Sequence, residues 1–250
     1  MSVGIDAHNL IVPDWPAPAN VRAVATTRQN GVSKPPYDSF NLATHVGDQT
    51  EAVIKNRQQL KTQLQLKHEP CWLEQVHSHH VMEACEIENP VQADASFTRQ
   101  LQQVCVVMTA DCLPVLFCDR QGSVVAAAHA GWRGLADGIL EATINSMQVQ
   151  SDALLVWLGP AIGAQAYEID SAVRDSFVTK SSDAESAFVA TRKGHWLMDM
   201  YELARQRLQT MGVSHIFGGD FCTYTDSERF YSFRREDVTG RMASLIWLQG

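Results

Sequence analysis

Three side chains that can bind a metal ion stand out in the sequence: His77, Cys112 and His129. Cys112 and His129 each interrupt an apolar, strand-like run, TADCLPVLF and AAAHAGWRG, and His77 lies upstream in LEQVHS. Two imidazoles and one thiolate can hold a zinc ion and leave one coordination position free, which separates a catalytic zinc site from a structural one. The leading hypothesis from these residues is an enzyme.

The residues around the cysteine suggest further chemistry. Pro114 cannot donate a ladder hydrogen bond, so we expect a backbone bend that exposes Cys112. Asp111, directly before it, could orient an imidazole or act as a general base. After the second run, residues 131–134 (GWRG) turn into an expected helix, whose backbone amides could hold an anion together with the charge of Arg133.

Each of these residues also has a plainer structural interpretation. A single cysteine in an apolar run is usually a small buried hydrophobe. A histidine at a strand end is more often a structural hydrogen-bonding residue, and His77 has two neighbours, His79 and His80, that could make it part of a solvated loop. Asp111 could simply make a turn. The spacing alone leaves a metal site and these alternatives open.

Composition excludes several classes of function. The chain has 250 residues, 45% of them hydrophobic, which is enough for a sizeable core, and a net charge of −8. Such an acidic surface repels a phosphate backbone, so we expect no nucleic-acid partner. The longest apolar stretch, residues 104–118, is interrupted and too short to span a bilayer. Without a secretory signal pattern, we expect a cytoplasmic protein whose six cysteines are free.

Hydrophobic patterning predicts strands and helices that alternate irregularly. We expect helices that begin near Asp48 and Asp170 as caps, and one that ends before Gly212. The expected strands cover residues 21–26, 71–77, 104–109, 115–118, 124–129, 153–158 and 242–248. The expected helices cover residues 48–66, 132–147, 169–178 and 196–211. This order favours mixed sheets with helices outside over a strict βαβ repeat.

Longer motifs make the chain recognisable. They are TTRQNGVSKPPYDSFNLATHVGD, LEQVHS, TADCLPVLF, AAAHAGWRG, LGPAIG and CTYTDSERFYSFRREDVTGRMASLIWL, spread over residues 26–248. In this set and order, the chain resembles the bacterial laccase-domain family, called multicopper polyphenol oxidase-like and now regarded as purine nucleoside phosphorylases. The motifs are specific and cover nearly the whole chain.

The resemblance implies a fold, a metal and a reaction. The fold is a single α+β domain over residues 1–250, with mixed β-sheets in a layered sandwich and helices on the outside. The metal is a catalytic zinc held by His77, Cys112 and His129. The associated activities are phosphorolysis of adenosine, inosine and methylthioadenosine to free base and ribose 1-phosphate, with some adenosine deamination. No ligand position departs from the family's pattern.

The expected partners are therefore a purine nucleoside and phosphate. Arg28 and Arg133 are candidate phosphate clamps, because a guanidinium binds oxyanions through two parallel hydrogen bonds. His45 or Asp111 could move protons. The plainer interpretations are that Arg28 pins the turn at Asn30, where the family usually has glycine, that Arg133 covers Trp132, and that His45 is a structural hydrogen-bonding residue.

Three other functions stay open. A copper-dependent polyphenol oxidase is the family's older label, but nine histidines with one H-x-H pair cannot build four copper sites in the laccase manner. A cysteine hydrolase or amidase acting on peptidoglycan precursors would use Cys112 as nucleophile and His129 as base. A non-catalytic module stabilised by zinc would unfold without its metal. The sequence does not predict the oligomeric state.

Overall fold

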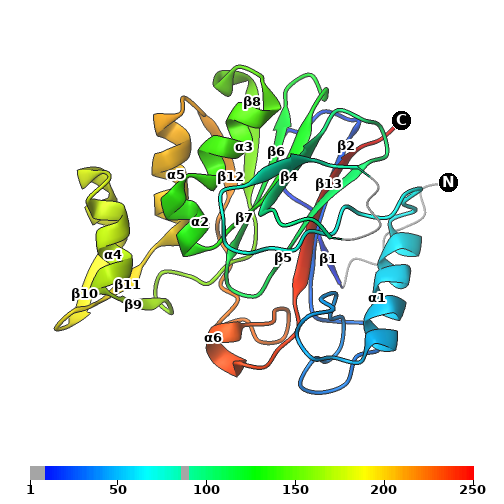
Figure 1. Cartoon of the computed structure of the whole chain (residues 1–250), viewed down its shortest axis with the longest axis horizontal. Helices are drawn as coiled ribbons and strands as arrows, with labels where there is room; N and C mark the ends of the chain where they lie inside the picture. The colour runs from blue at the N-terminus through cyan, green and yellow to red at the C-terminus, as the bar shows by residue number, and fades with distance from the viewer. Residues whose placement is uncertain (1–8, 86–89) are drawn as a thin grey trace.

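Two large β-sheets packed face to face form the frame of the molecule (Figure 1). The computed structural model describes residues 9–85 and 90–250. The first sheet has four antiparallel strands in the order β1-β2-β13-β5. Its strands are β1 (Leu10–Ile11), β2 (Val21–Thr26), β13 (Met242–Leu248) and β5 (Val104–Thr109).

The second sheet has six strands in the order β12-β8-β6-β7-β4-β3. The outer pairs, β12 with β8 and β3 with β4, are parallel, and the central pairs are antiparallel. Its strands are β12 (His215–Gly218), β8 (Leu154–Leu158), β6 (Leu113–Asp119), β7 (Val125–Ala130), β4 (Ala95–Thr98) and β3 (Val81–Glu83). The sheet is therefore mixed, as the sequence predicts.

Close packing between the sheets depends on small side chains in β7. Val107 and Ile246 of the first sheet belong to one buried cluster with Leu116, Ala127 and Trp157 of the second. The two alanines that flank Ala127 belong instead to the cluster on the opposite face. Because alanine is the smallest side chain that still packs, both neighbouring layers can approach β7 closely.

Helices cover the two outer faces, which confirms the predicted layered α+β sandwich (Figure 1). The outer face of the four-stranded sheet is covered by α1 (Thr50–Gln63). The six-stranded sheet is covered by α2 (Trp132–Asp137), α3 (Ile139–Met147) and α5 (Met200–Thr210). No helix within residues 9–85 and 90–250 is long and apolar enough to cross a membrane.

A small third sheet lies beside this sandwich, next to α4 (Figure 1). Its strands, in the order β10-β11-β9, and the helices outside the main layers have the following bounds: β9 (Glu168–Asp170), α4 (Ser171–Val178), β10 (Phe188–Arg192), β11 (His195–Met198), α6 (Phe233–Glu236), and the 3-10 helices η1 (Ser151–Ala153) and η2 (Ser182–Ala187).

Two predicted helices differ from the structure. The helix predicted over residues 132–147 is two helices, because Gly138 takes a left-handed conformation with φ of 96° between α2 and α3. The helix predicted over residues 196–211 starts later: residues 196–198 belong to β11, and Asp199 caps α5 by accepting the amide of Glu202. Gly212 follows α5 with φ of 87°, as predicted.

Three local predictions are wrong for identifiable reasons. Asp48 does not cap α1, because its carboxylate accepts hydrogen bonds from Ser33, Asn41 and the amide of Gln49. Residues 71–77 make isolated bridges instead of a strand. Pro114 lies inside β6, and the bend expected there falls instead at residues 110–112, which include Cys112. The proline fits in the strand because its carbonyl accepts the amide of Gly159, and its nitrogen, which has no hydrogen, faces the same side before pairing with β8 begins.

Asn56 of α1 holds the loop that follows β2. Its buried amide group donates to Ser33 Oγ and to the carbonyls of Ser39 and Asn41, at 2.9–3.2 Å. Its carbonyl oxygen accepts the amide of Val32 at 2.9 Å. One side chain therefore satisfies four polar groups of the loop and attaches the loop to the helix.

We predict that Asn56→Leu, which keeps the size of the side chain but makes no hydrogen bond, lowers the free energy of unfolding by roughly 2–4 kcal/mol, because it leaves buried loop groups unpaired. Urea unfolding measures the loss. The matched control is Lys55→Ala at the exposed neighbouring position, expected within about 0.5 kcal/mol of the parent. Equal unfolding midpoints for Asn56→Leu and the parent would contradict the role given to this amide.

Candidate metal centre

The three predicted ligands come together in the structure. The ligand atoms of His77, Cys112 and His129 all lie within 4.8 Å of one another. Cys112 Sγ is 3.8 Å from His77 Nε2, and the two imidazole rings meet edge to face with centroids 4.8 Å apart. Tetrahedral zinc, with bonds of roughly 2.0–2.3 Å, keeps its ligand atoms roughly 3.5 Å apart, so these three atoms would hold a zinc ion after a small inward movement.

Strand pairing brings Cys112 and His129 to the same edge of the six-stranded sheet. Cys112 directly precedes β6, and His129 is the last residue but one of β7. Because β6 and β7 are antiparallel, with Leu113 opposite Ala130, the start of one strand lies beside the end of the other. The cysteine and the histidine, separated in sequence by a whole hairpin, therefore become neighbours.

A buried carboxylate, Asp94, positions the third ligand. It lies directly before β4, and its oxygens accept the backbone amides of Val76, His77 and Ser78 at 3.3, 3.0 and 2.6 Å and the Ser78 hydroxyl at 2.7 Å. These contacts hold the turn in which His77 has a left-handed backbone with φ of 61°. Such strained conformations persist only where the surroundings impose them, and they concentrate at functional sites.

The same carboxylate orients His129. Asp94 Oδ1 is 2.8 Å from Nδ1 of the ring, and the Asp94 carbonyl accepts the His129 amide at 2.7 Å. Since a carboxylate only accepts, Nδ1 carries a proton, and Nε2 is the nitrogen left to bind a metal. A carboxylate that holds a ligating imidazole in this way is the common outer partner of zinc-bound histidine.

Electrostatics favour the thiolate form of Cys112. Burial alone would raise the pKa of its thiol, but the imidazoles of His129 and His77 outweigh burial and lower that pKa. Burial acts against the charged form of His129 too, yet Cys112 and Asp94 raise its pKa. A thiolate is the form in which cysteine binds zinc.

Gly131 closes one side of the cluster. A Cβ atom added to it would lie 2.8 Å from His77 Cδ2 and 3.0 Å from Cys112 Sγ, so a side chain cannot fit against the ligands. Two imidazoles, a thiolate and an orienting carboxylate fit zinc in number and type. Within the described residues, this is the one group of three or more histidine, cysteine or carboxylate side chains close enough to share a metal ion.

Asp111 has the contacts of a structural residue. Its carboxylate accepts from the hydroxyls of Thr223 and Ser232 at 2.6 and 3.0 Å and from the backbone amide of Arg234 at 2.7 Å. Its backbone is left-handed, with φ of 88°, and its side chain is buried. Three donors already occupy the carboxylate, which favours the turn interpretation over the general base.

None of the three predicted substrate contacts belongs to the ligand cluster. The guanidinium of Arg28 is paired with Glu236 at 2.9 Å and Asp38 at 3.6 Å, which favours its structural alternative over a phosphate clamp. Arg133 is exposed and stacks on Trp132 at 4.4 Å, so its guanidinium is accessible. For His45, burial and the charges of Arg241 and Arg57 lower the pKa, which favours the neutral imidazole.

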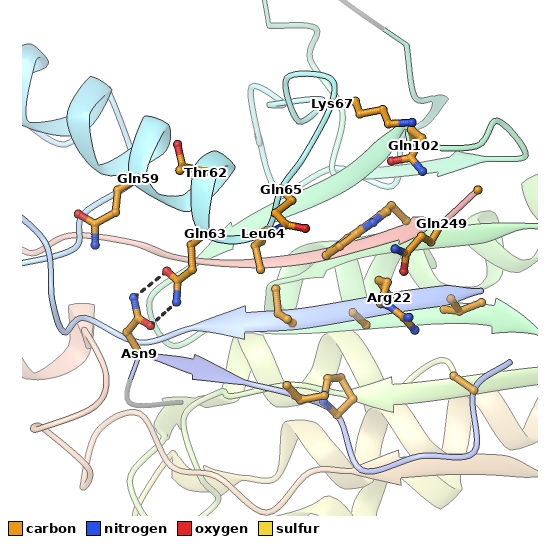
Figure 2. A pocket seen from close by; sticks show the side chains of 18 of the residues that line it. Asn9, Arg22, Gln59, Thr62, Gln63, Leu64, Gln65, Lys67, Gln102 and Gln249 are labelled. Atoms are coloured by element: carbon orange, nitrogen blue, oxygen red, sulfur yellow. Dashed lines mark hydrogen bonds between the residues drawn. The ribbon is translucent and has the colours of Figure 1, made fainter. Parts of the chain in front are cut away.

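The centre opens at the protein surface, since His77 is exposed and Cys112 is half-exposed. A cavity of about 1480 Å³ lies elsewhere, over the outer face of the four-stranded sheet (Figure 2). Arg22 and Gln249 line it, and Asn9 and Gln63 bridge β1 and α1 at its edge through two amide hydrogen bonds. A smaller cavity lies beside Arg28.

Asp94 is the residue that the sequence analysis missed. It lies in VQADASF, where a single carboxylate interrupts small and apolar residues at the start of a strand. A charged residue in such a run must find partners when buried, and that pattern could have marked it. Its partners in LEQVHS and in AAAHAGWRG, however, are distant in the sequence.

Comparison with known proteins identifies the family. A family model described as multi-copper polyphenol oxidoreductase laccase matches residues 22–249. The chain belongs to this family. A purine nucleoside phosphorylase of Pseudomonas aeruginosa is 54% identical over 240 residues, which cover 96% of this chain and 98% of the relative. Purine nucleoside phosphorylase YfiH of Escherichia coli is 51% identical with the same coverage.

Solved structures of relatives have the same fold. The crystal structure of a Neisseria meningitidis protein, 50% identical, matches with a TM-score of 0.94 and covers 97% of this chain and 100% of its own. YlmD from Geobacillus stearothermophilus matches with a TM-score of 0.88 at 28% identity, with 98% of both chains covered. The family resemblance and the fold class predicted from the sequence are both confirmed.

We predict that Asp94→Asn lowers zinc affinity about 10–100-fold, because the amide cannot accept the Nδ1 proton and three backbone amides with the same strength. Competition with a chromophoric chelator measures the affinity. The matched control is Asp119→Asn, a second buried carboxylate that accepts the amides of Ser123 and Val124 at the other end of β6. Equal zinc affinity for Asp94→Asn and the parent would refute the orienting role.

Proposed function

We propose that the protein catalyses zinc-dependent phosphorolysis of purine nucleosides, among them adenosine, inosine and methylthioadenosine, to free base and ribose 1-phosphate. The observation that carries the proposal is the cluster of His77, Cys112 and His129, whose ligand atoms lie within 4.8 Å of one another. Relatives at 46–54% identity that carry the name purine nucleoside phosphorylase support it. Adenosine deamination is part of the proposal as a side activity.

The reaction requires one bond exchange. An oxygen of dihydrogen phosphate forms a bond to C1′ of the ribose while the glycosidic bond breaks. The bonding electron pair leaves with the purine nitrogen, which takes up the proton that the phosphate gives up. The protein therefore has to hold an anion, stabilise a cation-like ribose and help a proton reach the base.

The residues divide this work. His77, Cys112 and His129 would hold zinc, which when bound supplies Lewis-acid polarisation of a phosphate or purine acceptor. Asp94 keeps the His129 ring in the ligating tautomer. Arg133 attracts phosphate through its accessible guanidinium. His45, with its lowered pKa, is the candidate to move the proton of the departing base.

A second candidate, a cysteine hydrolase or amidase, is favoured by one observation. Asp94, His129 and Cys112 stand in the order carboxylate, imidazole and thiol, the arrangement that activates a cysteine nucleophile. In that case metal-free protein is the active form and a substrate analogue traps Cys112 covalently. The close position of His77 on the other side of the thiol favours the metal instead.

We predict that zinc-loaded protein releases adenine and ribose 1-phosphate from adenosine only when phosphate is present. Cys112→Ala removes one ligand and should reduce this rate by at least about 100-fold, in line with the loss of a ligand to a catalytic metal. Chromatography of free base and sugar phosphate measures the turnover. Cys118→Ala, a buried cysteine at the far end of β6, is the matched control and should retain activity.

Removal of the metal tests the remaining alternatives. Chelation should abolish phosphorolysis and leave a folded protein, because the extensive hydrophobic core does not depend on zinc. Re-addition of zinc should restore turnover. Unfolding on chelation, with no nucleoside turned over by the metal-loaded form, would instead support a zinc-stabilised module. The cytoplasmic location remains a prediction from the sequence.

A further inference from the structure

Two neighbouring arginines on α6 have different surroundings. The guanidinium of Arg235 donates to the carbonyls of Thr223, Tyr224 and Phe230 at 2.6–2.8 Å and pairs with Glu236 at 3.1 Å. Its donors are occupied by the loop that it holds together. This arginine is therefore structural.

Arg234 is available for a ligand. Its side chain is exposed and makes one described hydrogen bond, from Nη1 to the Glu168 carbonyl at 2.8 Å. Its guanidinium carbon lies 5.0 Å from the ring centroid of Tyr167. Over residues 9–85 and 90–250, no carboxylate forms an ion pair with it, although the chain carries an excess of eight negative charges. Two of its nitrogens thus remain free to donate.

A short path connects Arg234 to the metal centre. Its backbone amide donates to Asp111 Oδ2 at 2.7 Å, and Asp111 directly precedes the ligand Cys112. Tyr167, whose ring lies under the guanidinium of Arg234, is half-buried. Burial raises the pKa of this phenol, so it stays protonated and can donate a hydrogen bond.

Arg133, on α2, also starts from a backbone close to the ligand cluster. It lies two residues after Gly131, where an added Cβ would meet His77 and Cys112. The guanidinium of Arg133 stacks on Trp132, and this contact uses none of its N–H donors. Like Arg234, Arg133 has no ion-pair partner among the residues that the structure describes. The backbones of both arginines are thus placed close to the ligand cluster, and neither guanidinium has a carboxylate partner among the described residues.

Stacking alone does not account for Arg234. Arg174 stacks on Trp196 at 5.1 Å in the same way, but it is paired with Glu185 and Asp175. A stacked arginine that serves only packing can thus keep a carboxylate partner in this protein. Planar guanidinium groups that lack one, beside a metal centre, are suited to a tetrahedral oxyanion.

We propose that Arg234, the Tyr167 hydroxyl and Arg133 form the phosphate subsite beside the metal centre. The proposal rests on the proposed function for the identity of the anion as the nucleophile, and it adds two residues that hold the anion. Arg234 supplies charge and two donors. The Tyr167 hydroxyl supplies a third donor, and the Tyr167 ring, on which the guanidinium stacks, fixes the plane of the guanidinium. The hydrogen bond from its amide to Asp111 positions Arg234, and Tyr167 directly precedes β9. Neither position depends on a metal.

The test measures phosphate binding and turnover separately. Zinc-loaded parent, Arg234→Gln, Arg234→Lys and Tyr167→Phe are titrated with inorganic phosphate by calorimetry, without nucleoside. Loss of a charged donor pair should weaken phosphate binding about 10–100-fold for Arg234→Gln, with a smaller loss for Arg234→Lys and about 3–10-fold for Tyr167→Phe. Arg174→Gln, the stacked arginine with carboxylate partners, is the matched control and should bind phosphate as the parent does.

The outcomes separate this proposal from the proposed function. The subsite is supported if the variants bind phosphate more weakly, as expected, at unchanged zinc content and melting temperature. If no nucleoside is turned over in that case, only the proposed function fails. In active protein, the KM for phosphate should rise and the KM for nucleoside should stay near the parent value. Equal phosphate affinity in Arg234→Gln and the parent, or a rise confined to the nucleoside KM, overturns the proposal.

Discussion

The contact between one buried carboxylate and two distant segments governs the architecture of the candidate metal centre. Asp94 is fully buried and receives its hydrogen bonds from the turn that carries His77 and from the ring of His129. Burying a carboxylate is unfavourable unless its lone pairs all accept hydrogen bonds. Asp94 therefore holds the His77 turn and the His129 ring together, because both must donate to it. The centre is thereby shaped before any metal arrives, and metal binding need not pay for ordering the loop.

The rest of the fold serves to bring this carboxylate to the right place. Asp94 precedes β4, Cys112 precedes β6, and β7, which carries His129, lies between these two strands in the sheet. Antiparallel pairing on both sides of β7 brings the beginnings of its two neighbours to its end. The alanines of β7 let the four-stranded sheet and the helices pack closely on either face, so the strand that carries His129 is rigid.

The sequence predicts which three side chains come together and predicts their surroundings poorly, for physical reasons. His77, Cys112 and His129 are recognisable because their side-chain chemistry is rare in apolar runs. Asp94 and Tyr167 gain their roles only from tertiary neighbours, which no local pattern encodes. The helix predicted over residues 132–147 failed at Gly138, because apolar periodicity continues across a residue that takes a left-handed conformation. The run at 196–198 pairs with β9 and β10 instead of continuing a helix, since tertiary pairing overrides local propensity.

All four groups that build the centre come from a continuous stretch between His77 and His129, and all lie at one end of the central sheet. Neither α1 nor the small sheet of β9, β10 and β11 supplies a ligand. Peripheral elements of a domain open more readily than its central strands. Fraying of the outer helix or of the small sheet would therefore leave the arrangement of these four groups intact.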